Sequence, residues 1–254
     1  MASRYPNTKK GFTIIEVMLF LAITGLMMIG IFAASKNSIN NQRYSTAVTS
    51  FQSYFQDQYS AVQNVRNDRP ADITCTSGAV SIGGAATGVG TGQCSIIGRM
   101  IVANSAKELA SYPIYATRDV SKLSDSCENG TTNILSSGCA NAVVNTNSSE
   151  SDADSMYQLA WDTSMQAVAP GSAAISTLTL AIYRSPANGQ LAMQWSHKST
   201  TNMTQFLANL ASGSVKICVN RSGWTTVPTM GIMIDASTIG SSNAVSRIAG
   251  GDGC

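Results

Sequence analysis

The sequence predicts an α+β protein in which a long N-terminal hydrophobic helix packs against a globular head built on an antiparallel β-sheet. Residues 17–35 (VMLFLAITGLMMIGIFAAS) are apolar and carry no charge. From Tyr44 to Val62, apolar and aromatic residues then recur every three or four positions, which is the spacing of one helix face. In the C-terminal third, short runs alternate apolar with other residues around turn sequences, a pattern typical of paired strands.

The composition indicates a secreted protein with an uncharged polar surface. Charged residues make up only 12% of the 254 residues, about half the usual share. The net charge of the chain is +2. The N-terminal residues Arg4, Lys9 and Lys10 contribute +3, so the rest of the chain carries a net charge of −1. A nearly neutral head gives no general attraction to nucleic acid. Nucleic acid therefore stays open as a partner but has no support from charge.

The apolar stretch that opens at Phe12 is long enough to cross a ~30 Å hydrocarbon layer as a helix. Lys9 and Lys10 precede it, so the leader is expected to stay in the cytoplasm and the rest to cross the membrane. A secretory signal cleaved near Ala34 is the alternative, but it does not explain Glu16. A carboxylate inside a membrane helix costs a few kcal/mol unless it has a partner.

The first forty residues resemble the class III signal of type IV prepilins and type II secretion pseudopilins. The resemblance lies in KKG at 9–11 followed by FTIIEV at 12–17. It implies that a prepilin peptidase cleaves after Gly11 and that the new amino group of Phe12 is methylated. It also implies that Glu16 pairs with the Phe12 amine of a neighbouring subunit.

The same resemblance implies a division of the chain and a set of partners. The expected segments are a removed cytoplasmic leader (1–11), a transmembrane and filament-core helix, the pilin spine (12–34), its amphipathic half (35–69), and an extracytoplasmic head (70–254). The partners implied are other pilin subunits, the prepilin peptidase, the pilus assembly platform and, before assembly, the cytoplasmic membrane. After assembly the protein is expected in an extracellular filament.

The helix departs from many members of that family in having no proline about twenty residues into its mature part. Ala33 holds that position, and no proline occurs between residues 7 and 69. Any softening of the helix would have to come from Gly25 or Gly30, each of which costs about 1 kcal/mol in a helix against ~3 for proline. The segment Arg66–Pro70 is expected to end the helix.

Six cysteines lie beyond residue 70 at wide spacings, and His197 is the only histidine. This pattern favours disulfides in an oxidising compartment over a metal site, with reduced buried thiols as the alternative. Short loops close most readily, so of the fifteen possible connectivities we expect the one that pairs cysteines adjacent in the sequence. The last bridge of this set resembles the C-terminal disulfide loop of many pilins. The expected pairs are Cys75–Cys94, Cys127–Cys139 and Cys218–Cys254.

The C-terminal third predicts two strand pairs and a short helix. Ile175–Arg184 and Gln190–His197 read as a hairpin across the turn 186–189, and Val215–Arg221 pairs with Trp224–Asp235. Pro228 suggests a bulge or an edge position in the last strand. Residues 202–211 (NMTQFLANLA) read as the helix between the two pairs.

No catalytic residue, metal site or cofactor is predicted. Residues 76–93 are glycine-rich but lack the sequence pattern of a phosphate-binding loop. Residues 145–155 are acidic but lack the glycine and the terminal glutamate of an EF-hand calcium site. His197 has no nucleophile-elbow motif nearby that would indicate a catalytic triad. The expected function is a structural subunit of a type IV pilus-like filament for adhesion, twitching motility or DNA uptake. A large head favours a minor or specialised pilin. The alternatives are a pseudopilin of a type II secretion system and a membrane-anchored extracytoplasmic binding domain.

Overall fold

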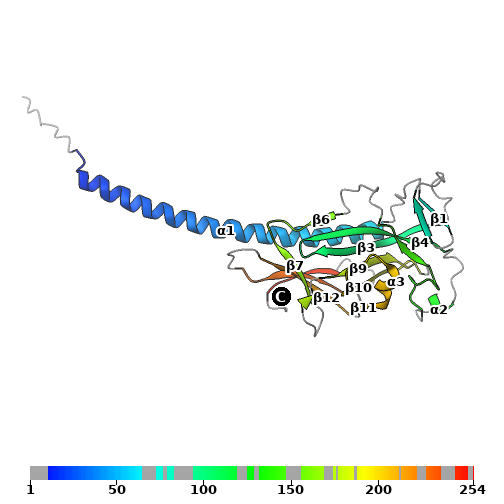
Figure 1. The fold of residues 1–254 in the computed structure, drawn as a ribbon. Coiled ribbons are helices and arrows are strands. Elements are labelled where there is room, and N and C mark those ends of the chain that lie inside the picture. The colour runs from blue at the N-terminus through cyan, green and yellow to red at the C-terminus, as the bar shows by residue number, and fades with distance from the viewer. Residues whose placement is uncertain are drawn as a thin grey trace, which may run out of the picture.

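The computed structural model shows one long helix that projects from a β-rich head (Figure 1). It describes residues 11–64, 73–76, 79–82, 94–118, 125–128, 132–146, 156–168, 174–175, 177–185, 188–211, 213–221, 227–235, 244–250 and 254.

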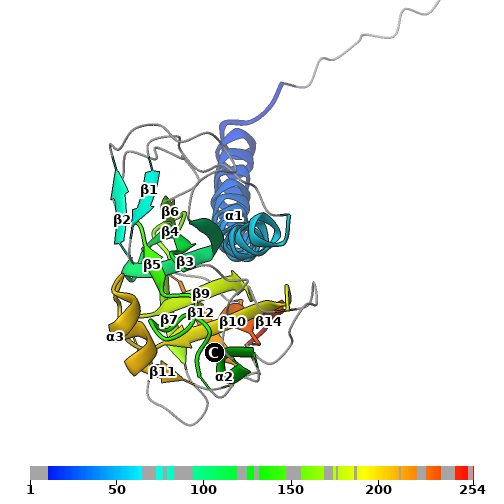
Figure 2. The same ribbon diagram turned by 90° about the vertical axis from the view of Figure 1, so that its right-hand side faces the viewer.

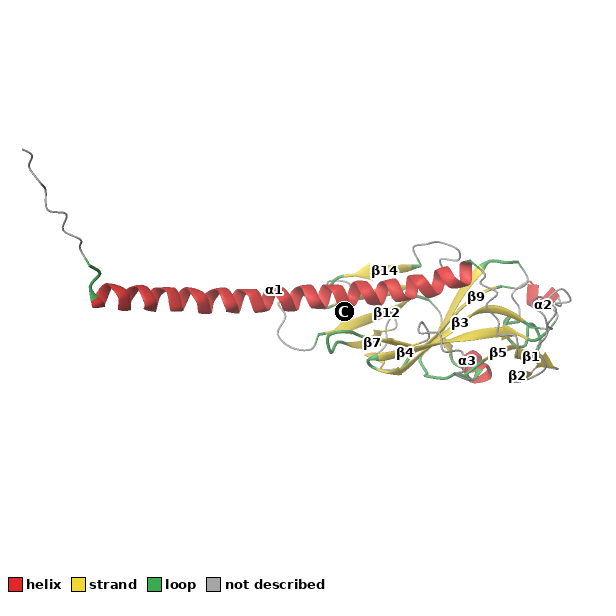
Figure 3. Cartoon of the chain, turned by 90° about the horizontal axis from the view of Figure 1, so that it is seen from above, coloured by secondary structure: helices red, strands yellow, loops and turns green. Residues whose placement is uncertain are grey.

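Helix α1 (Ile14–Gln63) is continuous over 50 residues, a length of about 75 Å at 1.5 Å per residue. Thr13 caps its start, because the Thr13 Oγ1 accepts a hydrogen bond from the N–H of Glu16. At the other end the N–H of Asn64 donates to the Ser60 carbonyl. Figure 3 shows that the N-terminal part of α1 extends well beyond the strands of the head.

The head contains two larger antiparallel sheets and a small one. The seven-stranded sheet has the order β11-β10-β9-β3-β4-β5, with β6 also paired to β4. Its strands are β3 (Ser95–Ser105), β4 (Glu108–Ala116), β5 (Ala142–Val144), β6 (Met156–Gln158), β9 (Thr179–Arg184), β10 (Leu191–Ser196) and β11 (Leu210–Ala211).

The five-stranded sheet has the order β14-β13-β12-β7-β8. Its strands are β7 (Ser164–Val168), β8 (Ala174–Ile175), β12 (Val215–Asn220), β13 (Met230–Ile234) and β14 (Val245–Ile248), and the two-stranded sheet pairs β1 (Ile73–Thr76) with β2 (Ala79–Ile82). Two short helices, α2 (Asp125–Glu128) and α3 (Met203–Ala208), complete the head.

The C-terminal half of α1 and the two larger sheets share one hydrophobic core. Phe51 of α1, Leu180 of β9 and Ile232 of β13 all belong to this cluster and are fully buried. Figure 2 views α1 nearly end-on and shows the strands gathered on one side of the helix. The opposite face of the seven-stranded sheet forms a second cluster with α3, in which Met100 packs with Phe206. The predicted α+β architecture is therefore confirmed.

The two predicted strand pairs are present, with corrected boundaries. β9 pairs with β10 and β12 pairs with β13, both antiparallel, and α3 lies between the pairs. The last predicted strand begins at Met230 and not at Trp224, which lies outside the described residues. Pro228 is neither a bulge nor an edge residue of a strand: it precedes β13, which lies between β12 and β14. Because proline has no N–H to donate, it cannot lie inside such a central strand.

Strands β3 and β4 were not predicted from the sequence. They form the longest hairpin of the head, with a tight turn at Ala106 and Lys107. Apolar residues on β3 face both hydrophobic clusters, as Ile101 and Val102 illustrate. A strand buried on both faces lacks the alternation of apolar and polar residues that indicates a half-buried strand.

Candidate functional site

The N-terminal half of α1 is an apolar surface with no cover from the rest of the described chain. Its most hydrophobic 18-residue window has a mean hydropathy of 2.5 and none of it is buried. By length and composition the helix can cross a membrane. The exposed large side chains are Phe12, Ile14, Ile15, Val17, Met18, Leu19, Phe20, Leu21, Ile23, Leu26, Met27, Met28, Ile29, Ile31, Phe32 and Ile39. An uncovered surface of this size needs lipid or other apolar helices around it.

Glu16 lies in the first turn of α1, at the edge of this apolar surface. Its N–H is held by the side chain of Thr13 at 3.3 Å and by the Thr13 carbonyl at 3.1 Å. Its side chain is exposed, and within the part of the chain that the structure describes, no hydrogen bond or ion pair involves its carboxylate. The first turn of a helix carries a partial positive charge that favours a carboxylate there.

Gly11 and Phe12 lie just before α1 and are both exposed. Phe12 is 81% exposed, and a Cβ atom placed on Gly11 would meet nothing within 4 Å. Among the described residues, nothing covers Gly11 or Phe12. Residues 1–10, which include Lys9 and Lys10, lie outside the described residues.

The helix changes from an exposed to a packed surface at Tyr44, the first buried residue of α1. The Tyr44 hydroxyl donates to the Val219 carbonyl at 2.7 Å and accepts from the Met230 N–H at 2.6 Å. Val219 and Met230 face each other across β12 and β13, so this hydroxyl joins the helix to both strands. Its position in the apolar stripe was visible in the sequence, but its partners, some 180 residues away, were not.

A second polar contact joins α1 to the seven-stranded sheet farther along. The buried Gln58 side chain accepts a hydrogen bond from the Ser111 hydroxyl at 2.8 Å. Buried polar groups are costly without a partner, so this contact favours one placement of the helix on β4.

Burial also changes the acidity of several tyrosines in the head. It raises the pKa of Tyr44, although the Met230 N–H and the positive charges of Arg221 and Arg247 oppose the rise. Burial raises the pKa of Tyr157 and Tyr183 to about 12.

The structure contains the disulfides Cys127–Cys139 and Cys218–Cys254, which close 12- and 36-residue separations. Cys218 lies in β12, so the second bridge ties the chain end to the five-stranded sheet. Cys94 is also disulfide-bonded. Its expected partner Cys75 has a side chain outside the described residues, so the pair Cys75–Cys94 stays a prediction.

The remaining candidate residues form no common site. His197 is exposed directly after β10, and no group of three metal-ligating side chains occurs among the described residues. The glycine-rich residues 83–93, the acidic residues 147–155 and the expected helix end at 66–70 lie outside the described residues. The helix itself ends with Asn64 as its C-cap.

Comparison with known proteins identifies the N-terminal segment. Residues 6–32 match the family model of the prokaryotic N-terminal methylation motif. No curated protein and no solved structure matches the chain. The matched residues contain Gly11, Phe12 and Glu16 and, apart from Ile39, all the exposed large apolar side chains of the N-terminal half of α1 and the residues just before it. The chain therefore carries at its N-terminus the class III signal of type IV pilins and pseudopilins.

Proposed function

We propose that the protein is a structural, non-catalytic subunit of a type IV pilus-like filament that serves adhesion, twitching motility or DNA uptake. One observation carries this proposal: an apolar helical surface with a carboxylate at its start projects, uncovered, from a folded head. Before assembly the lipid bilayer covers this surface. In the filament the corresponding helices of other subunits replace the lipid.

Glu16 is the proposed assembly contact. Phe12 lies four residues before it, just outside the start of α1 at Ile14. A neighbour displaced along the filament axis by roughly one helical turn brings the ammonium group of its own Phe12 next to the Glu16 carboxylate. In low dielectric, removing one member of such a pair costs about 3–5 kcal/mol, since the remaining charge is left without its partner.

The first test is the N-terminus of the mature protein. Mass spectrometry of assembled material should find a chain that starts at Phe12 with a methylated amino group. The exposure of Gly11 and Phe12 supports that cleavage. A mature chain that starts at or after Ser35 would show that residues 1–34 act as a secretory signal, and an uncut Met1 would show that no leader is removed. Either result contradicts the proposal.

The second test is Glu16→Ala, with Glu16→Gln as a matched variant of nearly the same shape. Filament yield should fall at least a hundredfold relative to trimmed, membrane-bound subunit, which corresponds to about 3 kcal/mol or more. Membrane insertion and the fold of the head should be unchanged, because the packed core begins at Tyr44. Normal filaments in both variants would show that Glu16 is not the assembly contact.

Electron microscopy of sheared surface material, labelled for this protein, distinguishes the filament from the alternatives. A surface filament that contains the protein supports the pilin assignment, and sparse or tip-restricted labelling identifies a minor pilin. A short periplasmic assembly that is required for protein secretion identifies a pseudopilin. Membrane-bound protein that enters no assembly contradicts both the pilin and the pseudopilin assignment.

A further inference from the structure

The end of the head nearest the exposed half of α1 carries a basic pocket with an aromatic wall. It has a volume of about 380 Å³ and lies between α1 and the loop that joins β6 to β7. Asn40 and Arg43 contribute from α1, Trp161 and Thr163 from the loop, and Arg221 from the end of β12. The Arg43 guanidinium carbon lies 4.8 Å from the centre of the Trp161 ring.

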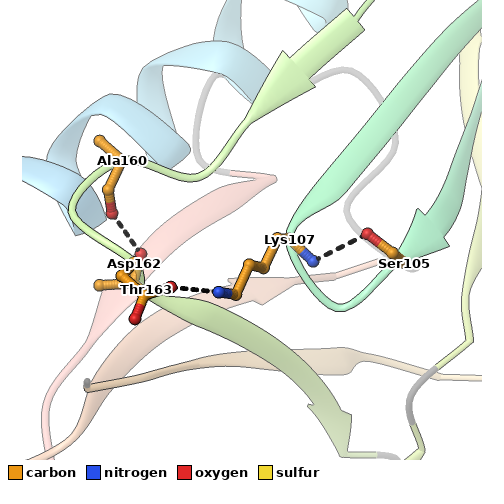
Figure 4. Close-up of polar contacts among 5 residues, drawn as sticks. All are labelled: Ser105, Lys107, Ala160, Asp162 and Thr163. Carbon is orange, nitrogen blue, oxygen red and sulfur yellow. Dashed lines mark hydrogen bonds and ion pairs between the residues drawn. The ribbon is translucent and has the colours of Figure 1, made fainter.

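The loop presents Trp161 to solvent in a defined conformation. Trp161 and Asp162 adopt backbone φ angles of 59° and 57°. Aspartate tolerates this left-handed region, but it is unfavourable for a bulky residue such as tryptophan. The loop is held by the ion pair between Lys107 and Asp162 and by a 2.8 Å hydrogen bond from the Thr163 hydroxyl to the Ala160 carbonyl (Figure 4). The surrounding structure thus compensates for strain that places an indole ring at the surface.

This exposed indole is unusual for the head. Among the described residues beyond α1, Trp161 and Met156 are the large hydrophobic side chains that remain exposed, at 53% and 61%. Tryptophan is enriched where a protein meets the headgroups of a bilayer, because its ring is apolar and its N–H is polar.

The pocket also lies at the right height for that contact. The uncharged run of α1 ends at Ser35 and the first charge beyond it is Lys36, so the hydrocarbon layer ends near this point. Arg43 follows seven residues later, about 10 Å along the helix, and helical side chains tilt back toward the N-terminus. The headgroup layer is roughly 5–8 Å thick on each side. Its phosphates are therefore within reach of the Arg43 guanidinium.

We propose that this pocket binds the phosphate of an anionic phospholipid while α1 anchors the subunit in the membrane. A guanidinium group donates paired hydrogen bonds to phosphate oxygens, and Arg43 brings one to the pocket. The Arg221 guanidinium donates to the Val227 carbonyl and adds its positive charge to the lining. Asp162, the carboxylate of the pocket, is already paired with Lys107, so the pocket keeps a positive balance. The bound lipid would hold the head upright over the bilayer before assembly. This inference rests on the membrane anchoring contained in the proposed function.

The test uses the full-length mature protein in phosphatidylcholine vesicles that contain a small fraction of nitroxide-labelled lipid. The label, carried near the top of the acyl chain, is on phosphatidylglycerol in one series and on phosphatidylcholine in the other. The emission that Trp161→Phe removes reports the indole of the pocket. We expect labelled phosphatidylglycerol to quench this emission several-fold more than labelled phosphatidylcholine. Arg43→Gln should lower that preference about fivefold, the effect of one basic residue at an anionic surface.

The matched control is Arg184→Gln, which makes the same change of charge at the distal end of the head. Arg184 ends β9 next to the start of β3, whereas Lys107 follows the end of β3. This variant should keep the full lipid preference. Equal quenching by the two lipids, or an unchanged preference in Arg43→Gln, would overturn the inference.

Two further readouts separate the failures. Vesicle flotation reports anchoring by α1: a protein that does not float refutes the anchoring and this inference together, whereas one that floats without preferential quenching refutes the inference alone. If Arg43→Gln lowers filament yield but keeps the lipid preference, the pocket receives an acidic side chain of a neighbouring subunit and the lipid proposal is wrong.

Discussion

Replacing Tyr44 with phenylalanine removes the hydroxyl that joins α1 to the five-stranded sheet. In the native protein this hydroxyl donates a hydrogen bond to the Val219 carbonyl at 2.7 Å and accepts one from the Met230 N–H at 2.6 Å. A buried polar group left without a partner costs about 1–3 kcal/mol. Val219 and Met230 lie opposite each other, so the strands can partly close the gap. We therefore expect a loss of about 2 kcal/mol in the free energy of unfolding, near the middle of that range.

Thermal unfolding of the full-length protein in detergent, followed by circular dichroism with the disulfides intact, measures this loss. For a domain of about 150–250 residues, 2 kcal/mol lowers Tm by about 4–8 °C. Tyr59→Phe is the matched control, because Tyr59 is also buried on α1 but its hydroxyl has no hydrogen-bond partner within the described part of the chain. Its removal should leave Tm unchanged or raise it slightly.

The decreases of Tm in Tyr44→Phe and Tyr59→Phe together test whether the Tyr44 hydroxyl stabilises the protein through its two backbone contacts. Equal decreases of Tm would mean that the loss comes from the phenol ring environment in general and not from the two backbone contacts of Tyr44. No decrease in Tyr44→Phe would mean that β12 and β13 pair fully without the hydroxyl. In either case the proposed role of Tyr44 in placing α1 on the sheet would be refuted.

Two further predictions concern the seven-stranded sheet. Gly98→Ala would place a methyl carbon 2.6 Å from the Cα atom of Tyr183 and should lower the free energy of unfolding by about 1–3 kcal/mol. The control Gly138→Ala, whose added methyl carbon has its nearest neighbour at 3.7 Å, should leave the free energy of unfolding unchanged. Equal denaturant midpoints for the two variants would contradict this prediction. Burial raises the pKa of Tyr183 from 10.0 to about 12, so its contribution to stability is fully present below pH 10 and is lost as the pH rises toward 12, because the unfolded chain loses the proton first. Tyr183→Phe should therefore show a smaller decrease of the denaturant midpoint over that range than the native protein, and parallel curves would rule the mechanism out.

The sequence by itself was sufficient for features that depend on neighbours along the chain. The uncharged run at 17–35 and the stripe that starts at Tyr44 predicted α1, because helix faces repeat every three or four residues. The hairpin of β9 and β10 was predictable from alternation around one turn. The N-terminal signal depends on contiguous residues, so it could also be recognised from the sequence.

The tertiary structure alone decided how distant segments meet. β3 pairs with β9, and β12 with β7, over long stretches of chain, and such registers depend on packing against the shared core and not on local pattern. In the same way, the backbone partners of Tyr44 and the contact of Arg43 with Trp161 join residues that are more than a hundred positions apart. The sequence determines which surfaces of α1 are apolar. Folding decides that the head covers only those from Tyr44 onward and leaves Glu16 and the apolar segment exposed.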